Sequence, residues 1–250
     1  MNNHLFYIGA DTAALRCTRA YLMEQGLAIA PAPSRNVTHL ILNVPTFSPD
    51  GSLVGGGDAA EILSRLPVGV TVIGGNLTSP IFKDHSTWDL LKNEAYLAEN
   101  AAITAECALQ LAMNQSPATI RGASALVLGW GRIGKCLSKL LGAIGVNVTV
   151  AARKEADIAM AQALGYSGIS LKNIAPELPR FRILFNTIPA MVLPDSVSSL
   201  CRDNCLKIDL ASTSGIGGSD VVSARGLPGK MVPETAGHLI AKTIIREVST

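Results

Sequence analysis

The residues most suited to chemistry form a glycine motif between an apolar segment and a helix-period segment. Ala125 to Leu128 is followed by Gly129-Trp130-Gly131-Arg132-Ile133-Gly134, a Gly-x-Gly-x-x-Gly pattern. In such a motif the first glycine permits a tight turn, the second lets the backbone approach a pyrophosphate, and the third lets helix and strand pack closely. The free amides and positive dipole end of the following helix favour phosphate groups. The motif predicts a dinucleotide site at residues 129–134; a plain strand-to-helix turn is the alternative.

The tip of the next expected strand bears on the choice between NAD and NADP. An NAD site usually has an acidic residue there, about twenty residues after the motif, to accept from the ribose hydroxyl. This chain has Ala151-Ala152-Arg153-Lys154 instead. A guanidinium pairs with a phosphate through two hydrogen bonds. We therefore predict NADP, held by Arg153 and Lys154. The alternative is that Arg153 is a solvated surface charge and that NAD is accepted too.

The elements that must position these residues alternate along the whole chain. Apolar runs and helix-period segments follow one another, as in repeated βα units of a mainly parallel sheet. In the first part we expect strands at 5–8, 27–30, 38–44 and 70–73, and helices at 12–25 and 58–66. In the second part we expect strands at 125–129, 147–151, 167–170, 182–186, 205–209 and 230–232, and helices at 132–144, 154–164 and 234–248. One or two helices within 88–114 would join the two parts.

This pattern predicts an α/β protein with two Rossmann-like domains, the second a doubly wound six-stranded parallel sheet. The first domain is expected at 1–100, with 234–250 as a segment that could pack back onto it, and the dinucleotide-binding domain at 101–231. The active cleft is expected between them. The loop 45–57, rich in Pro, Gly, Ser and Asp, is either a lid or binding loop or a mobile excursion.

Composition excludes several classes of protein. The 250 residues carry a net charge of +2 without a run of Lys and Arg, so nothing predicts nucleic-acid binding. No stretch of about twenty apolar residues predicts a membrane span, and the N-terminus does not read as a signal peptide. The five cysteines include no Cys-x-x-Cys pair and there are few histidines, so we expect no metal site and thiols buried in a reducing cytosol.

Further motifs point to one family. They are Asn186-Thr187-Ile188-Pro189, Asp209-Leu210-Ala211-Ser212, and Gly226-Leu227-Pro228-Gly229 leading to Pro233-Glu234-Thr235-Ala236-Gly237. With the opening Ile8-Gly9-Ala10-Asp11 they resemble the family of the dipicolinate synthase A-subunit, which resembles the formate and glycerate dehydrogenases. The resemblance covers most of the chain, more firmly after Arg121, and the last motif is the most specific.

The resemblance implies oxidation of a dihydrodipicolinate-level precursor from the lysine pathway to dipicolinate, a dicarboxylate of bacterial endospores. It also implies a partner B subunit that resembles flavoproteins, and the cytoplasm of the sporulating mother cell. A homodimer is expected from the general habit of such enzymes.

The remaining site residues are expected at the carboxyl ends of strands, where open parallel sheets bind ligands. Asn186, Thr187, Ile188 and Pro189 follow the fourth strand of the second domain, Ala211 and Ser212 the fifth, and Pro233 to Ala236 the sixth; all should line the nicotinamide side. A dicarboxylate needs hydroxyl, amide or cationic donors, for which the candidates are Ser79, Thr104, Ser212, Thr235 and Ala236, with Asp11 and Asn76 also at strand ends. Ordinary turn chemistry is the alternative for each.

Two residues are candidates for the base that removes a proton during oxidation. Glu106 lies on the connecting helix, and His238 lies about one turn into the last helix. A solvated helix face and a structural imidazole are the respective alternatives. The Arg, Glu and His set of 2-hydroxyacid dehydrogenases is not recognisable. A dehydrogenase or reductase of another small acid therefore stays open, as does a subunit that binds NADP and leaves the chemistry to a partner.

Overall fold

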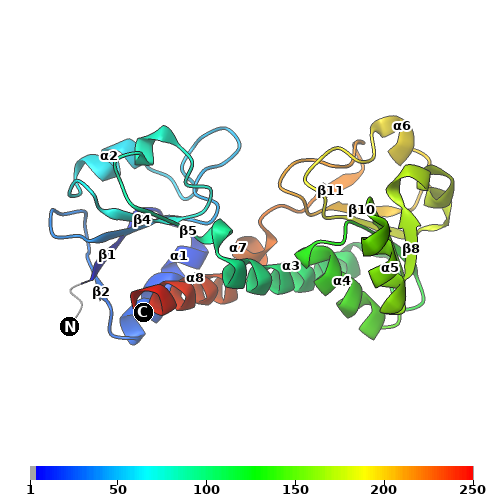
Figure 1. Ribbon diagram of the computed structural model, residues 1–250, viewed down its shortest axis with the longest axis horizontal. Helices are drawn as coiled ribbons and strands as arrows, with labels where there is room; N and C mark the ends of the chain where they lie inside the picture. Colours follow the sequence, from blue (N-terminus) through cyan, green and yellow to red (C-terminus); the bar gives the residue numbers. More distant parts are fainter. Residues whose placement is uncertain (1–3, 250) are drawn as a thin grey trace. The chain divides into compact units, whose positions relative to one another are not determined.

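The computed structural model describes residues 4–249, which form two compact units (Figure 1). Unit 1 holds the described residues up to 100 and from 228 onward, and unit 2 holds 101–227. Each unit is built on its own parallel sheet, so the predicted α/β class with two Rossmann-like sheets is confirmed. None of the helices within the described residues is long and apolar enough to cross a membrane.

The sheet of unit 1 has five parallel strands in the order β2-β1-β3-β4-β5. They are β1 (Leu5–Ile8), β2 (Ala28–Ile29), β3 (His39–Ile41), β4 (Thr71–Gly74) and β5 (Thr87–Asp89). The first four strands match predicted ones, but β5 falls partly where a helix was expected. Its three residues carry too little periodicity to be recognised, and pairing with β4 makes them a strand.

Side-chain caps start the two α-helices that follow strands of unit 1. In α1 (Ala13–Glu24), Thr12 Oγ1 accepts a hydrogen bond from the amide of Leu15 at 3.2 Å. In α2 (Ala59–Ser64), Asp58 Oδ1 accepts one from the amide of Ala60 at 2.8 Å. Two short 3₁₀ turns, η1 (Pro80–Phe82) and η2 (Leu90–Lys92), flank β5. The caps satisfy amides that would otherwise lack partners at each helix start.

The last helix, α8 (Pro233–Val248), belongs to unit 1 and lies along α1 (Figure 1). Gly237 makes this close approach possible, because a Cβ there would lie 2.3 Å from the carbonyl oxygen of Ala14. Thr18 Oγ1 donates across the contact to the carbonyl of Gly237 at 3.1 Å. Two helices far apart in sequence thus share one interface.

The segment 45–57 folds into a small hairpin rather than a long open loop. Phe47 and Leu53 form an antiparallel bridge, and the amide of Val54 donates to the carbonyl of Thr46 at 3.0 Å. The Val44–Pro45 peptide bond is cis. Leu53 is buried in the core of unit 1, so the hairpin is anchored to the domain.

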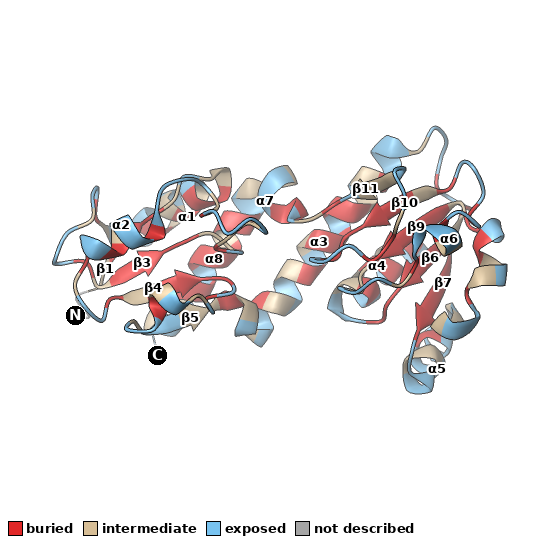
Figure 2. Ribbon diagram, turned by 90° about the horizontal axis from the view of Figure 1, so that it is seen from above, coloured by how far each residue is buried: buried red, intermediate tan, exposed pale blue. Residues whose placement is uncertain are grey.

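The sheet of unit 2 has six parallel strands in the order β11-β10-β9-β6-β7-β8. They are β6 (Ser124–Leu128), β7 (Asn147–Ala152), β8 (Ser167–Ser170), β9 (Ile183–Asn186), β10 (Leu206–Asp209) and β11 (Val221–Ser223). Counted along unit 2 the order is 6-5-4-1-2-3, that of a dinucleotide-binding fold. Figure 2 shows the central strands β10, β9, β6 and β7 buried between the layers, as expected for a sheet covered on both faces, whereas the edge strands β8 and β11 are largely half-buried.

The prediction of a strand at 230–232 is wrong. Residues 227–231 form a short helix, α7 (Leu227–Met231), and the sixth strand is β11, where Val222 pairs with Ile208 of β10. Gly226, at a φ of 65°, and Pro228 mark a helix start, whereas the short apolar run Met231-Val232 gave no basis for distinguishing strand from helix. Residues 233–236 therefore do not follow a strand of this sheet.

The helix α3 (Glu94–Gln115) begins in unit 1 and leads into unit 2 before β6. The other helices of unit 2 follow its strands: α4 (Arg132–Ala143), α5 (Glu155–Ala163) and α6 (Asp195–Ser198), with 3₁₀ turns η3 (Leu171–Asn173) and η4 (Ala175–Arg180). The turn between β6 and α4 is the glycine motif, and the turn between β7 and α5 contains Arg153. The two predicted cofactor segments thus end on neighbouring strands.

Candidate functional site

The structure shows a different steric environment at each glycine of the motif. Gly129 has a φ of 101°, a conformation that other residues rarely adopt. A Cβ on Gly134 would lie 2.2 Å from the carbonyl oxygen of Gly129, so α4 can meet β6 only with glycine there. A Cβ on Gly131 would meet nothing within 4 Å. Protein packing does not explain Gly131, and open space beside bare backbone at the start of α4 fits a phosphate group.

Strand register brings four turns together at one edge of the sheet of unit 2. Leu128 pairs with Ala151 and with Asn186, and Asn186 pairs with Asp209. The residues after these strand ends are therefore neighbours: the glycine turn, Arg153, Thr187 and Leu210. The strand order reverses between β6 and β9, and ligands of open α/β sheets bind at such a switch point.

Arg153 and Lys154 are exposed at the tip of β7. No hydrogen bond or ion pair engages Arg153 within residues 4–249, and Lys154 stands at the N-cap of α5. The amide of Gly129 donates to the carbonyl of Ala151 at 2.9 Å, which holds the glycine turn beside this tip. A guanidinium without a protein partner can pair with a phosphate that reaches it from the turn.

Trp130 and Ile133 pack against the protein, whereas Arg132 is exposed. The indole of Trp130 is 7% exposed, faces the Tyr166 ring at 6.0 Å, and leaves its buried Nε1 without a partner among the described residues. Trp130 therefore anchors the glycine turn by packing, and its backbone rather than its ring is suited to a ligand.

A buried carboxylate that the sequence reasoning did not assign organises the neighbouring loops. Asp209, 2% exposed, accepts from Asn186 Nδ2 at 2.8 Å, and from the amides of Ala211 at 3.1 Å and Gly215 at 2.8 Å. Asn186 Oδ1 in turn accepts from the amide of Ile188 at 3.0 Å. The sequence signal was present: polar residues end two apolar strands that become neighbours in the sheet.

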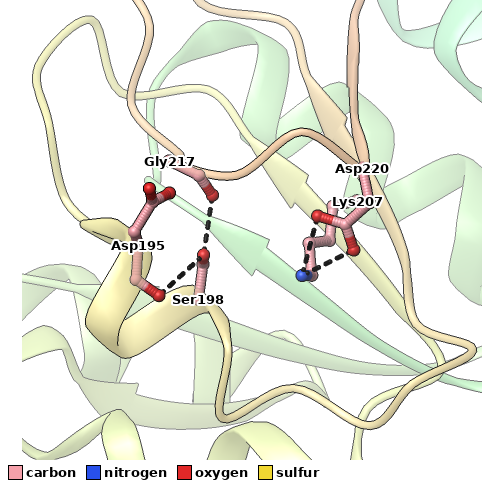
Figure 3. A network of polar contacts seen from close by, with 5 residues as sticks. All are labelled: Asp195, Ser198, Lys207, Gly217 and Asp220. Atoms are coloured by element: carbon pink, nitrogen blue, oxygen red, sulfur yellow. Dashed lines mark hydrogen bonds and ion pairs between the residues drawn. The ribbon is translucent and has the colours of Figure 1, made fainter.

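The loop that follows Asp209 is fixed at its far end by two further contacts (Figure 3). Ser198 Oγ donates to the carbonyl of Gly217 at 2.6 Å, and Lys207 Nζ pairs with Asp220 Oδ2 at 2.9 Å. The hydrogen bond from buried Lys207 lowers the pKa of the Asp220 carboxyl. Residues 211–220 are thus held at both ends beside the sheet edge.

These networks refine the roles of the residues predicted on the nicotinamide side. The amide group of Asn186 and the hydroxyl of Thr187 are used inside the protein, the latter donating to the carbonyl of Leu128 at 2.8 Å. Ile188 lies against Gly129, and Pro189 is exposed. Ala211 is buried, and Ser212 is exposed beyond the end of β10. Of these, Ser212 and Pro189 are the groups open to a ligand.

The remaining candidates are divided between the units. In unit 2, Glu106 is exposed on α3, and Thr104 is buried with a polar partner. In unit 1, half-buried Ser79 precedes η1, and the first turn of α8 carries exposed Thr235 and buried Ala236. His238 packs on Tyr21 of α1, with ring centroids 4.6 Å apart. The fold does not assemble these residues into one acid–base set within either unit.

The cysteines and acidic residues form no metal centre within residues 4–249. Cys107, Cys201 and Cys205 are buried, and Cys17 and Cys136 are half-buried. At the edge of the second sheet, the exposed groups include the cations Arg153 and Lys154 and the hydroxyl of Ser212.

Comparison with curated proteins finds a relative in the family that the motifs resemble. The A-subunit of dipicolinate synthase from Bacillus subtilis (strain 168) is 33% identical over 155 residues, covering 58% of this chain and 52% of that protein. The chain thus matches about half the length of this curated relative. No family model matches the chain.

Solved structures share the fold over nearly the full length. The dipicolinate synthase A-subunit from Bacillus halodurans has a TM-score of 0.86 at 23% identity, covering 99% of this chain and 98% of that chain. The one from Bacillus subtilis has a TM-score of 0.83 at 24% identity, covering 100% and 97%. A transhydrogenase from Sinorhizobium meliloti follows at 0.75 and 11% identity, covering 98% and 93%. The resemblance predicted from the motifs is thereby confirmed: the chain is a relative of the dipicolinate synthase A-subunit.

Proposed function

We propose that this protein is an NADP-dependent oxidoreductase that forms dipicolinate from a dihydrodipicolinate-level precursor. The observation that carries the proposal is the turn after β6, where a Cβ on Gly131 would meet no atom of residues 4–249 within 4 Å. Arg153 at the neighbouring strand tip, which pairs with no residue in the described part of the chain, supports NADP over NAD. The curated relative and the solved neighbours support the substrate class.

In this proposal each part of the sheet edge has one task. The amides at the start of α4 bind the pyrophosphate, and Arg153 with Lys154 binds the ribose phosphate. Ser212 and the 186–189 turn line the nicotinamide side, where Asp209 fixes both loops. The bound nicotinamide supplies the hydride acceptor.

Substrate binding and proton removal are further parts of the proposal. Ser79, Thr104, Ser212, Thr235 and Ala236 stay candidates for the two carboxylates, and Glu106 and His238 for the base. The ring of a dihydropyridine becomes aromatic when it loses a hydride and a proton, which makes proton loss easy. A weak or remote base is then sufficient, consistent with the exposed position of Glu106.

A second candidate function is an NADP-binding subunit that leaves the chemistry to a partner. It is favoured by His238, which packs on Tyr21 rather than standing free at a strand end. We also propose that this partner is a flavoprotein-like B subunit, that the chain forms a homodimer, and that it works in the cytoplasm of the mother cell. Each of these rests on the name of the curated relative or on the habit of related enzymes.

The cofactor assignment is tested by titrating NADP and NAD into wild type and Arg153→Ala. Loss of a phosphate-pairing guanidinium should weaken NADP by about 1–3 kcal/mol and leave NAD nearly unchanged. Arg180→Ala is the matched control, because exposed Arg180 pairs with Glu177 just before β9 begins, at the opposite edge of the sheet. Equal loss for NADP and NAD would contradict the role of Arg153.

The reaction is tested by hydride transfer with the purified chain. Reduction of NADP with the dihydrodipicolinate-level precursor, but not with lactate or glycerate, is the expected result. Cofactor binding without turnover, reversed by adding a flavoprotein partner, would establish the second candidate instead. Turnover with lactate or glycerate would show a dehydrogenase of another small acid.

A further inference from the structure

Unit 1 has a cavity of its own at the carboxyl end of β1. Its volume is about 390 Å³, and every residue that lines it belongs to unit 1. Three segments form the wall: the turn Gly9–Asp11, one face of α1, and the glycine run 55–57. A cavity of this size accommodates a small organic molecule.

The cavity carries a surplus positive charge. Arg16 and Arg19 lie on successive turns of α1 and both line it. Arg16 Nη1 donates to Asp11 Oδ1 at 2.5 Å, so one guanidinium is neutralised. Half-buried Arg19 has no ion-pair partner within the part of the chain that the structure describes. An anionic group in the cavity would supply that partner.

The glycine run keeps the cavity open. Gly55, Gly56 and Gly57 have φ values of 96°, 84° and 88°, which side chains disfavour. A Cβ on Gly56 would meet nothing within 4 Å, and the first contact of one on Gly57 would be at 3.8 Å. The amide of Asp11 donates to the carbonyl of Gly55 at 3.1 Å, which fixes the run against the start of α1. A Cβ on Gly55 would lie 2.9 Å from the amide nitrogen of Asp11, so packing requires glycine there, whereas Gly56 and Gly57 present bare backbone to open space.

The topology marks the same place. In the order β2-β1-β3-β4-β5 the connections reverse direction between β1 and β3. Open parallel sheets bind ligands beyond the carboxyl ends of the strands at such a reversal. The residues after β1 are those that line the cavity, so charge, shape and topology converge there.

We propose that this cavity of unit 1 binds the carboxylate of a small organic acid through Arg19, while Arg16 stays paired with Asp11. The identification of that acid as the substrate rests on the proposed function, whereas the site itself rests on unit 1 alone. Neither arginine was among the expected substrate residues. From the sequence alone, both look like ordinary solvated charges on the surface of a helix.

The test is calorimetric titration of the full chain with dipicolinate, picolinate and inorganic phosphate in metal-free buffer. Arg19→Gln should weaken dipicolinate at least tenfold, since a charge-assisted pair is lost. Asp11→Asn should tighten it several-fold, because it releases Arg16. Arg65→Gln is the matched control: exposed Arg65 pairs with Glu61 of α2 as Arg16 does with Asp11, and this change should leave the affinity unaltered.

The outcomes separate this site from the cofactor site. Opposite shifts for Arg19→Gln and Asp11→Asn, with unchanged NADP affinity, support the proposal. It is overturned if wild type does not bind dipicolinate with or without NADP, if both variants bind as wild type does, or if phosphate binds as tightly as the organic acids. A chain that binds dipicolinate through Arg19 but does not bind NADP would refute the proposed function and leave this site standing.

Discussion

Two glycines of the motif after β6, Gly131 and Gly134, are needed for different reasons. Gly134 is required by packing, since its neighbour is a backbone carbonyl that cannot rotate away. Gly131 is not required by packing, because its surroundings are empty. The sequence motif contains both glycines but does not show that their roles differ. The structure shows this difference, and substituting each glycine by alanine would measure it.

Gly131→Ala should fold normally and lose NADP affinity at least tenfold, because the new Cβ occupies the space for the pyrophosphate. The loss in stability should be about 1 kcal/mol or less, since the backbone φ of −78° suits alanine. Thermal unfolding and NADP titration measure the two effects.

Gly134→Ala is the counterpart and should lower stability by about 1–3 kcal/mol, because its Cβ would lie 2.2 Å from a carbonyl oxygen. An alanine at position 131 that left NADP affinity intact would argue against a dinucleotide in this turn.

At the scale of elements, the interface of α1 and α8 depends on one small residue. A Cβ on Gly237 would approach the carbonyl of Ala14 at 2.3 Å and the side chain of Cys17 at 2.8 Å. Gly237→Ala should therefore separate the helices and lower the stability of unit 1 by about 1–3 kcal/mol.

Gly229→Ala is the control for that change and should have the opposite sign. Gly229 lies in α7, where a Cβ would meet nothing within 4 Å, so alanine gains helix propensity of up to about 1 kcal/mol. Urea unfolding of both variants gives the comparison. A neutral Gly237→Ala would show that the helices can shift without cost.

Long periodic elements were predictable, as were β2 and β3, which lie within longer apolar runs, but the short β5 and β11 were not. The helix after the glycine motif and the strands at its flanks agree with the sequence because apolar spacing and caps act locally. β5 and β11 have three residues each and owe their form to pairing with β4 and β10. The failed strand at 230–232 has the same cause: three residues do not define a period.

At the scale of the whole molecule, the proposed cofactor site could be predicted from the sequence more readily than the rest of the proposed machinery. The glycine turn and Arg153 were predicted because each is a local pattern after a strand. Asp209 and the cavity beside Arg19 were missed, since their contacts join residues far apart in sequence. Roles that depend on which strands become neighbours require the fold.

The two units also differ in what should change their stability. In unit 1, burial and the neighbouring His4 lower the pKa of His39 to about 4 from 6.5. Between these values the unfolded chain binds a proton that folded unit 1 rejects, so unit 1 loses stability as the pH falls through this range. The loss should be about 1–3 kcal/mol. Unit 2 should instead respond to NADP, which stabilises the folded form that binds it.

One tryptophan in each unit makes this difference observable. Trp88 lies 5.1 Å from the His39 ring in unit 1, and Trp130 lies in the glycine turn of unit 2. In Trp130→Phe, the Trp88 signal in urea unfolding should move to lower urea between about pH 7 and pH 5, and His39→Gln should reduce that shift. In Trp88→Phe, the Trp130 signal should move to higher urea with NADP. If both signals moved together under acid and under NADP, the two units would unfold as one cooperative structure. The prediction that each unit has its own stability would then be wrong.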